Sequence, residues 1–475
     1  MTESANGVAS VEYLIEGTVI TMDGEGRVIR DGAVAVDDGR IVAVGKTTDV
    51  RRDHAATKVL GGPRHFVVPG MIDCHNHLAQ ALVRDHALED LPNIYRIYVP
   101  TEMALDADDA RVCATFGIAQ LLRAGVTTVA ETTFTEGHEE AISSVIVDTG
   151  IRAAMARGQG DRVTWLASNY DQVEQKSWLR DDPGLLREDL QRTEEFLRRW
   201  QSSPGGRLRP WINNLGVPSC SEDRFLQTKE LAEKYGSGMM VHINRDREEI
   251  ELSLALFGER PIEHLYRIGA LSPGFVAIHA MLTTDREIEM LAETGAGVAH
   301  APVVCTDILS AVTKVPTMRA SGVVVGLGCD TVINDILKVM RIAFIMHAQE
   351  TGTRLFDPFS FTTEDAFRMG TIDAARLLHW DEEIGSVEAG KAADLAVING
   401  ANVRLTPAYN PVGTLVRYAT GTDVESVLVA GRLVVDGGEL LTINEHELLD
   451  EAERVGAMLG GVLASRRYVP HRETL

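Results

Sequence analysis

The stretch Phe66-Val67-Val68-Pro69-Gly70-Met71-Ile72-Asp73-Cys74-His75-Asn76-His77 is an apolar run that ends in two histidines. In an extended strand, residues two apart point to the same side, so His75 and His77 face one way. Two imidazoles at the end of a buried strand can bind one metal ion of the zinc class. Such ions favour nitrogen ligands and activate water when a coordination position stays open. Cys74 should face the other way, and we expect a packed core thiol there rather than a ligand.

Seven more short apolar runs follow, and helical stretches separate them. The eight runs are Phe66–Cys74, Val126–Ala130, Ile151–Ala156, Leu208–Asn213, Met239–Ile243, Phe275–Ile278, Gly297–Ala299 and Val323–Leu327. Thr284-Asp285-Arg286-Glu287 is a capping-box pattern that begins one helix, and Gly295 is suited to end it. Alternating strands and helices are typical of an α/β fold with a parallel sheet. Eight repeats predict a (β/α)8 TIM-like barrel, with its active site at the C-terminal strand ends.

The two ends of the chain have a different pattern, in which short alternating strands meet at Asp-Gly turns. The strands expected from this pattern are Thr18–Met22, Gly32–Val36, Arg40–Gly45, Asp394–Ile398 and Val427–Val435. Such alternation is the signal of β-hairpins. We therefore expect a composite β-sandwich built from residues 1–68 and residues 384–475, the latter with a terminal helix. Residues 69–383 would form the barrel.

The composition excludes some functions. The net charge of the 475 residues is −23, so the surface should repel nucleic acid and anionic membranes. No apolar run of about eighteen residues is present, and Met1–Glu16 lack the pattern of a secretory signal. The five cysteines are scattered without close pairing, which fits a reducing cytosol. We expect a cytoplasmic protein that acts on a small molecule.

Polar side chains follow four more of the apolar runs at the point where each run ends. They are His242 after the fifth run, His279 after the sixth, His300 after the seventh and Asp330 after the eighth. In a barrel these strand ends converge on one pocket. One histidine alone is more often a hydrogen-bonded core residue, but the set as a whole predicts a metal site.

These motifs resemble those of the amidohydrolase superfamily, in the branch that contains cytosine, guanine and adenosine-type deaminases and triazine hydrolases. The residues that carry the resemblance are Val68–His77, His242, His279, His300, Leu327–Asp330 and Gly385–Leu395. The resemblance covers nearly the whole chain and implies the barrel with its composite β-sandwich. It also implies one divalent metal ion. Zinc or iron is the expected metal, and manganese or cobalt is an alternative. The habits of the family further suggest a homo-oligomer.

The resemblance implies a role for each strand-end residue. The metal ligands would be His75, His77, His242 and Asp330. His279, helped by Asp330, would orient or deprotonate the attacking water. His300 would line the substrate pocket.

The chain departs from the family at two places. Deaminases of this branch carry a glutamate three residues after the fifth-strand histidine, where it moves protons to a ring nitrogen, but here that position is Arg245. An arginine cannot act as an acid or base near neutral pH, although it can bind a carbonyl oxygen or an oxyanion. Glu248 or Glu249, one turn further on, is an alternative proton carrier. A His-Ala-Pro-Tyr-like motif after strand four is altered to Gly216–Ser221.

The lack of a lysine in Trp211–Asn214 argues against a carboxylated-lysine bridge between two metals and favours one metal. The loss of the glutamate moves the expected reaction toward hydrolysis of an amide or a substituted aryl urea, with Arg245, Asn244 or His300 stabilising the developing charge. An alternative is a deaminase or dechlorinase of an aminated N-heterocycle. A third is a catalytically silent barrel used for assembly.

Two long connections after barrel strands are expected to form lids or substrate walls. They are Val99–Asp109 and Trp165–Asp182. The aromatic side chains in or beside them would pack against an apolar substrate or against the barrel rim. These aromatic residues are Tyr95, Tyr98, Trp165, Tyr170 and Trp178.

Overall fold

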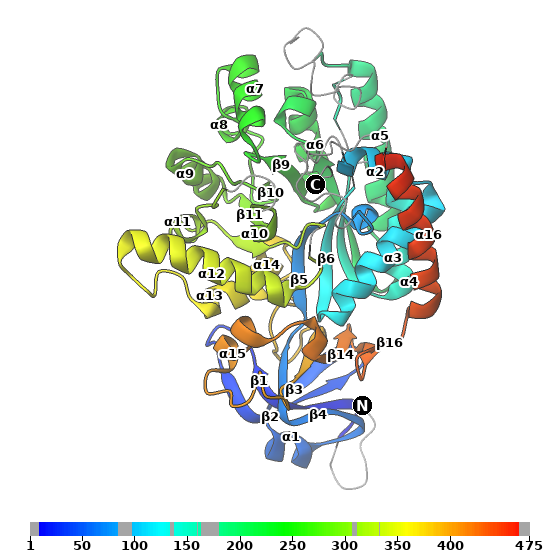
Figure 1. Cartoon of the computed structure of the whole chain (residues 1–475), viewed down its shortest axis with the longest axis vertical. Coiled ribbons are helices and arrows are strands. Elements are labelled where there is room, and N and C mark those ends of the chain that lie inside the picture. The colour runs from blue at the N-terminus through cyan, green and yellow to red at the C-terminus, as the bar shows by residue number, and fades with distance from the viewer. Residues whose placement is uncertain are drawn as a thin grey trace, which may run out of the picture.

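The computed structural model of the chain contains two eight-stranded sheets, and it describes residues 9–83, 97–133, 137–158, 160–162, 180–305, 311–331 and 333–464. One sheet is the wall of a nearly closed barrel (Figure 1). Its strands run parallel and stand in chain order. They are β5 (Met71–Asn76), β6 (Val126–Thr132), β7 (Arg152–Arg157), β8 (Leu208–Asn214), β9 (Met239–Ile243), β10 (Phe275–His279), β11 (Gly297–His300) and β12 (Val325–Leu327). The expected (β/α)8 barrel is confirmed.

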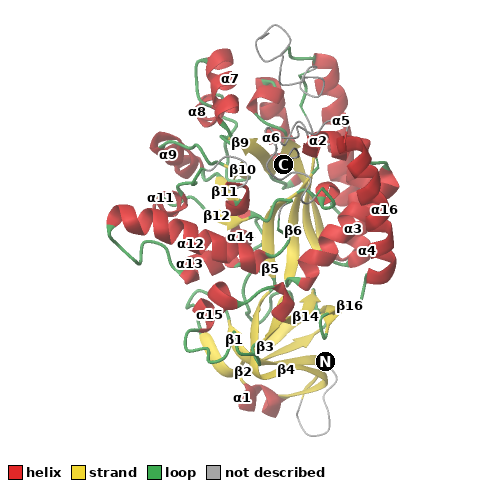
Figure 2. Cartoon of the chain, viewed as in Figure 1, coloured by secondary structure: helices red, strands yellow, loops and turns green. Residues whose placement is uncertain are grey.

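Helices surround the barrel strands on the outside (Figure 2). They are α3 (Ala107–Arg123), α4 (His138–Thr149), α5 (Pro183–Trp200), α6 (Glu222–Tyr235), α7 (Arg247–Phe257), α8 (Pro261–Arg267), α9 (Asp285–Thr294), α11 (Val315–Ala320), α12 (Ile336–Leu355) and α13 (Thr363–Met369). The helix α14 (Ile372–Leu377) packs instead against the inner core of the barrel. The expected ends of α9 are confirmed. Thr284 forms the capping box with Glu287, and Gly295 ends the helix in the left-handed conformation with φ 71°.

The side chains of the barrel strands divide between two cores. Alternate residues such as Ile72, Ala130 and Met240 form one buried cluster with Trp380, and they fill the inside of the barrel. The residues between them, such as Val129 and Val241, pack with the surrounding helices in a second and larger cluster. This period of two is what a sheet buried on both faces requires. Cys74 lies in the inner cluster, as expected of a core thiol.

The second sheet takes strands from both ends of the chain. Its order is β16-β15-β14-β13-β4-β1-β2-β3. The strands are β1 (Ala9–Ile20), β2 (Val28–Asp37), β3 (Arg40–Lys46), β4 (His54–Pro69), β13 (Leu395–Asn399), β14 (Val424–Val429), β15 (Arg432–Asp436) and β16 (Glu439–Leu440). The antiparallel pair β4 and β13 joins the N-terminal strands to the C-terminal strands. This sheet is therefore the composite unit expected from the two terminal patterns.

The first apolar run does not form one strand, as the sequence pattern suggested, because it is divided between the two sheets. β4 ends at Pro69 and β5 begins at Met71. Gly70, between them, donates its N–H to the carbonyl of Asp394 at 2.8 Å. A Cβ at Gly70 would lie 2.2 Å from Thr127 Oγ1, so only glycine fits this crossing.

The last helix, α16 (Glu445–Ala464), lies beside α3 on the barrel and away from the second sheet (Figure 1). Arg454 of this helix forms an ion pair with Asp109 at 2.9 Å. The remaining helices are α1 (Thr47–Asp53), α2 (Val99–Ala104), α10 (Pro302–Val304) and α15 (Pro411–Tyr418). Among the described residues, no helix is both long enough and apolar enough to cross a membrane.

Candidate metal centre

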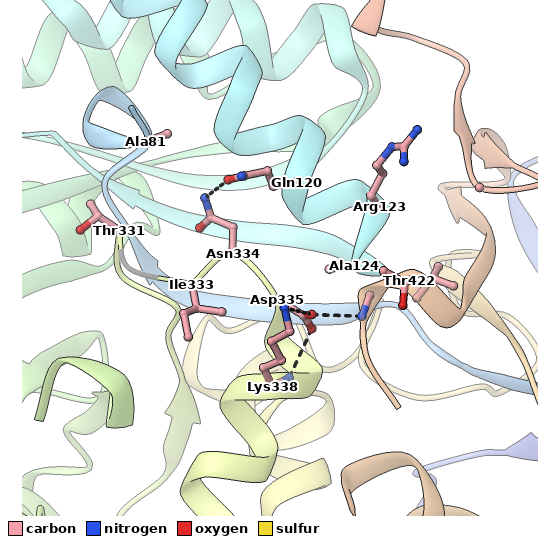
Figure 3. A pocket seen from close by; sticks show the side chains of 13 residues that line it. Ala81, Gln120, Arg123, Ala124, Thr331, Ile333, Asn334, Asp335, Lys338 and Thr422 are labelled. Carbon is pink, nitrogen blue, oxygen red and sulfur yellow. Dashed lines mark hydrogen bonds and ion pairs between the residues drawn. The ribbon is translucent and has the colours of Figure 1, made fainter. Parts of the chain in front are cut away.

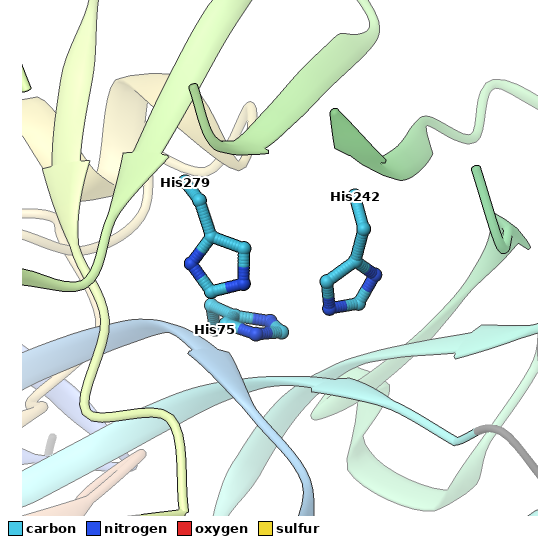
Figure 4. A group of neighbouring side chains, drawn as sticks. All are labelled: His75, His242 and His279. Carbon is cyan, nitrogen blue, oxygen red and sulfur yellow. The ribbon is translucent and has the colours of Figure 1, made fainter. Parts of the chain in front are cut away.

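Four barrel strands bring five ionisable side chains together at the C-terminal mouth of the barrel. His75 and His77 come from the end of β5, His242 from β9 and His279 from the last position of β10, and Asp330 follows β12. The ring centroid of His75 lies 4.6 Å from that of His77 and 4.9 Å from that of His242. Figure 4 shows the rings of His75, His242 and His279 turned toward one another.

The nitrogen and oxygen atoms of these side chains are close enough to share one cation. The ligand atoms of His75, His242 and His279 lie within 4.8 Å of one another, and so do those of His75, His77 and Asp330. Asp330 Oδ2 lies 3.4 Å from His75 Nε2 and 3.8 Å from His279 Nε2. The structure thus brings together all the residues that the sequence analysis assigned to the metal and to the attacking water.

Two buried nitrogens test whether this set fits a metal. His75 Nε2 and His279 Nδ1 have no hydrogen-bond partner within the described part of the chain. A buried polar atom without a partner is costly unless something else satisfies it. A set of imidazole nitrogens with one carboxylate matches the ligands that zinc and similar divalent ions take. The residues therefore fit a metal of this class.

The backbone bends sharply at the strand ends that carry these groups. His279 and Ala280 have φ values of 70° and 47°, Asn244 has 51°, and Asp330 has 54°. Left-handed φ values are unfavourable for residues other than glycine, and they gather where function needs a particular side-chain direction. These bends lie at the end of β10 and just after the ends of β9 and β12.

The tautomer of His77 is fixed by its neighbour on β6. His77 Nδ1 lies 2.5 Å from the carbonyl oxygen of Thr132 and donates to it. The lone pair is then on Nε2, which is the arrangement found in imidazoles that bind metals. The backbone N–H of Thr331 donates to Asp330 Oδ1 at 2.7 Å, which holds that carboxylate and leaves Oδ2 toward the imidazoles.

Burial favours the neutral form of three of these imidazoles. It lowers the pKa of His77 to about 3 and the pKa values of His242 and His279 well below their usual range, and the electrostatic influence of the neighbouring His75 lowers all three further. Burial alone would raise the pKa of Asp330, but His75, His77 and His279 outweigh it and keep that pKa below its ordinary value. The neutral imidazoles of His77, His242 and His279, beside an ionised carboxylate, are ready to bind a cation without first losing protons.

Arg245 lies at the edge of this cluster. Its side chain is 9% exposed, and its guanidinium forms an ion pair with Asp246 at 2.7 Å. After burial and the neighbouring imidazoles, the charge of Arg245 also lowers the pKa values of His242 and His279. The structure therefore puts a cation where the deaminases of the branch were expected to carry a carboxylate.

Glu249, on the first turn of α7, lies beside the backbone of Arg245. Its Oε2 accepts the N–H of Arg245 at 2.9 Å. Its Oε1 has no hydrogen-bond partner among the described residues. Burial raises the pKa of Glu249 to about 8, although the charge of Arg245 opposes the shift. Glu249 is thus a buried carboxyl that keeps its proton near neutral pH.

The two other residues assigned to the substrate have protein partners. Asn244 Nδ2 donates to Glu287 Oε1 at 2.9 Å, and His300 Nε2 lies 2.9 Å from Nε2 of His347 on α12. Contact of Asn244 and His300 with a substrate stays a prediction. The sequence analysis did not find His347, because nothing in the helical pattern of α12 distinguishes it from a core residue.

The sequence analysis also missed Glu131, which ends the second apolar run as the histidines end theirs. Its Oε2 accepts the N–H of Leu78 at 2.7 Å, and burial raises its pKa well above the usual value. Glu102 on α2 accepts from Gln80 at 2.7 Å and from Thr133 at 3.3 Å. The position of Glu131 at a strand end was the signal that would have found it.

The two expected lids have different outcomes. Val99–Asp109 forms α2 and the start of α3, and Tyr98 before it is buried. Most of Trp165–Asp182 lies outside the described residues, as do Tyr95, Trp165, Tyr170 and Trp178. Contact of these aromatic side chains with a substrate stays a prediction.

The chain is similar to known proteins along most of its length. The profile of the amidohydrolase family matches residues 66–434, and that of an imidazolonepropionase-like composite domain of bacteria matches residues 32–56. A 5-methylthioadenosine/S-adenosylhomocysteine deaminase of Symbiobacterium thermophilum is 31% identical over 452 residues, which are 93% of this chain and 98% of that protein.

Solved structures share the fold. An adenosine deaminase of Xanthomonas campestris with bound zinc has a TM-score of 0.85 at 24% identity, over 96% of this chain and 100% of that one. The zinc complex of an atrazine chlorohydrolase of Arthrobacter aurescens has a TM-score of 0.82 at 21% identity, over 94% of this chain and 100% of that one. The family match spans the barrel, the five strand-end residues and the strands β13 and β14 of the second sheet, so the chain belongs to the amidohydrolase family of divalent-metal hydrolases that act on carbon–nitrogen bonds other than peptide bonds.

Proposed function

We propose that this protein is a zinc-dependent deaminase of an aminated N-heterocycle, in the class of adenosine-like nucleosides. The observation that carries the proposal is the meeting of His75, His77, His242, His279 and Asp330 at the barrel mouth. The relative at 31% identity, which is named as a deaminase of two adenosine derivatives, supports this substrate class over an aryl urea. The alternative of the sequence analysis therefore becomes the leading function.

His75, His77, His242 and Asp330 would hold the metal. A divalent ion held this way lowers the pKa of water and stabilises negative charge on the substrate. His279 Nε2, 3.8 Å from Asp330 Oδ2, faces the same space and is placed to accept a proton from the attacking water. His279 then gives that proton to the leaving amine, and the ionised carboxylate of Asp330 stabilises the protonated imidazole in between.

A deaminase must also protonate the ring nitrogen next to the attacked carbon. Arg245 keeps its proton and cannot do this. We assign the step to Glu249, because its carboxyl is buried beside Arg245 and burial raises its pKa to about 8. A neutral carboxylic acid at pH 7 can donate a proton and recover it within one turnover.

One observation favours a second function, hydrolysis of an amide or aryl urea. The guanidinium of Arg245 contributes to the lowered pKa values of His242 and His279, which supports a position of its charge beside the reaction space. A fixed cation there stabilises an oxyanion that forms on a carbonyl oxygen. Such substrates have no ring nitrogen that needs a proton.

The identity of the released amine separates the two functions. We would incubate the zinc-loaded protein with adenosine derivatives, cytosine, guanine, aminated triazines, amides and aryl ureas, and measure ammonia and larger amines in parallel. The proposal predicts ammonia from a purine substrate and no aniline from the ureas. Aniline release without deamination would replace the proposal with the second function. A protein that binds no metal and turns over no substrate would instead fit the silent assembly role.

A further inference from the structure

A chain of hydrogen bonds between side chains connects the metal centre with the outside of the barrel. Asn334, in the loop before α12, donates from Nδ2 to Gln120 Oε1 at 2.9 Å, as Figure 3 shows. Its Oδ1 accepts from Asn76 Nδ2 at 2.8 Å. The same Nδ2 of Asn76 donates to Asp73 Oδ2 at 2.7 Å. Asn76 stands between two of the assigned ligands in the sequence, so the chain of bonds reaches the backbone that carries them.

Asp73 accepts hydrogen bonds from both sides of the barrel seam, which is the place where the first barrel strand, β5, meets the last, β12. Its Oδ1 accepts the N–H of His75 at 3.2 Å and the N–H of Cys329 at 2.9 Å. Cys329 directly precedes Asp330, and the N–H of Asp330 donates to the carbonyl of His75 at 2.9 Å. One fully buried carboxyl group thus holds the first and last barrel strands at the points where each presents an assigned ligand.

The seam needs this link because β5 and β12 are the two outer strands of the barrel sheet. In the described part of the chain, parallel ladders join each of the other neighbouring pairs but not these two. A ladder fixes the relative position of two strands through many bonds. Between β5 and β12, a few bonds from Asp73 and Asp330 fix the relative position of the strands instead. A shift of either strand would move an assigned ligand out of reach of the metal.

Asn334 reaches this link from a cavity of about 860 Å³ between α3 and α12 (Figure 3). The basic side chains of the cavity have acidic partners, Arg123 with Glu445 at 2.6 Å and Lys338 with Asp335 at 3.3 Å. These pairs balance the charge of the cavity, which therefore does not indicate a ligand of its own. Asn334 is half-buried there and touches none of the assigned metal ligands.

We propose that Asn334 is a positioning residue for the metal centre. Acting through Asn76 and Asp73, it fixes the two backbone segments that present His75, His77 and Asp330. Loss of its Oδ1 acceptor leaves Asn76 Nδ2 without one of its two bonds and loosens the hold of Asp73 on the seam. The inference rests on the proposed function, because it concerns the same metal site.

The test compares Asn334→Leu with Asn334→Asp. Leucine has nearly the same size but no acceptor, whereas aspartate keeps the acceptor for Asn76, and the Gln120 amide can turn to donate to it. Thr422→Val is the matched control, since Thr422 lines the same cavity but is not part of the chain of bonds. Each protein is stripped of metal. Zinc affinity is then measured by competition with a coloured chelator, and the visible spectrum is recorded with Co²⁺ in place of zinc.

We expect Asn334→Leu to weaken zinc binding by about tenfold or more and to shift the Co²⁺ spectrum, as changes behind a metal ligand do. The zinc affinity of Asn334→Asp and of Thr422→Val should stay within about twofold of that of the wild type. If Asn334→Leu does not fold, Asn334→Ser takes its place in the comparison. Unchanged affinity and spectrum in the folded variant would overturn the inference alone. Failure of the wild type to bind zinc would overturn the proposed function and this inference together.

Discussion

Asp330 is assigned both to the metal and to the proton transfer. It is the only carboxylate assigned to the metal, and its Oδ2 lies near both His75 Nε2 and His279 Nε2. Its ionised state depends on the three imidazoles, because burial by itself would raise its pKa. Removal of its charge therefore affects both the metal and the proton transfer.

We predict that Asp330→Asn loses the metal or lowers kcat by at least about 1,000-fold, since general acid–base groups contribute roughly 100- to 10,000-fold. Metal content and kcat of the purified variant give the measurement. Asp335→Asn is the matched control, because Asp335 caps α12 and accepts from Lys338 N but does not face the imidazoles. A variant with full activity and retained metal would show that Asp330 is not needed.

Glu249 predicts a dependence of stability on pH. Its pKa is raised from 4.5 to about 8 in the folded protein, so the folded state binds more protons between these values than the unfolded state. Its contribution is fully present below pH 4.5 and is lost as the pH rises through 8. The loss amounts to on the order of 5 kcal/mol.

Glu249→Gln should remove this loss, because glutamine does not ionise. Urea unfolding of both proteins at pH 5 and pH 9 gives the measurement. We expect the free energy of unfolding of the wild type to fall more steeply between these pH values than that of the variant. Equal slopes would mean that Glu249 is ionised throughout and cannot supply the ring proton. The variant should also deaminate more slowly while its zinc affinity stays unchanged.

The strand-end histidines and Asp330 were predictable from sequence because each follows a short apolar run, and a barrel brings such ends together. The partners of these residues were not predictable in the same way. The bond between His300 and His347 depends on how α12 packs over the barrel, and the contact of Glu249 with Arg245 N depends on the bend at Asn244. Sequence position shows which side chains reach the mouth but not which neighbours they meet there.

Among the elements, the eight barrel strands were predictable and the crossing at Gly70 was not. An apolar run has the same appearance whether it continues in one sheet or passes into another. The division depends on Asp394, whose carbonyl accepts the N–H of Gly70, and Asp394 is more than 300 residues away in sequence. The strand β4 (His54–Pro69) also begins well before Phe66, where the predicted apolar run begins, and its two glycines at 61 and 62 interrupt the apolar pattern there.

The barrel and the second sheet are joined by a buried ion pair. Arg152 on β7 donates two hydrogen bonds to the carboxylate of Asp394, each at 2.9 Å, and both side chains are almost fully buried. Asp394 Oδ1 also accepts the N–H of Ala430 at 2.8 Å. The carboxylate therefore ties a barrel strand to two segments of the second sheet.

We predict that Asp394→Asn lowers the free energy of unfolding by about 3–5 kcal/mol, because it leaves the buried Arg152 without its counter-ion. Glu383→Gln is the control, since Glu383 pairs with Arg209 at 2.6 Å in an exposed position. It should cost less than about 1 kcal/mol. Urea unfolding measures both. A cost for Asp394→Asn as small as that of the control would show that the ion pair does not hold the two sheets together.

At the scale of the whole molecule, the sequence patterns at the two ends of the chain predicted a unit whose strands lie on both sides of the barrel segment in sequence. β4 and β13 pair across more than 300 residues of sequence, so the second sheet closes around the chain that forms the barrel. The acidic surface, with a net charge of −23, fits a small-molecule substrate better than nucleic acid. Assembly into a homo-oligomer and a cytoplasmic location stay predictions, and light scattering of the purified protein tests the first.

The central claim is that distant parts of the chain form one metal site at the mouth of the barrel. The direct measurement is an anomalous difference map at the zinc absorption edge, from a crystal of the zinc-loaded protein. The account predicts one peak about 2.0–2.2 Å from nitrogens of His75, His77 and His242 and from an oxygen of Asp330. A map with no peak among these side chains, or with zinc bound only elsewhere, would contradict it.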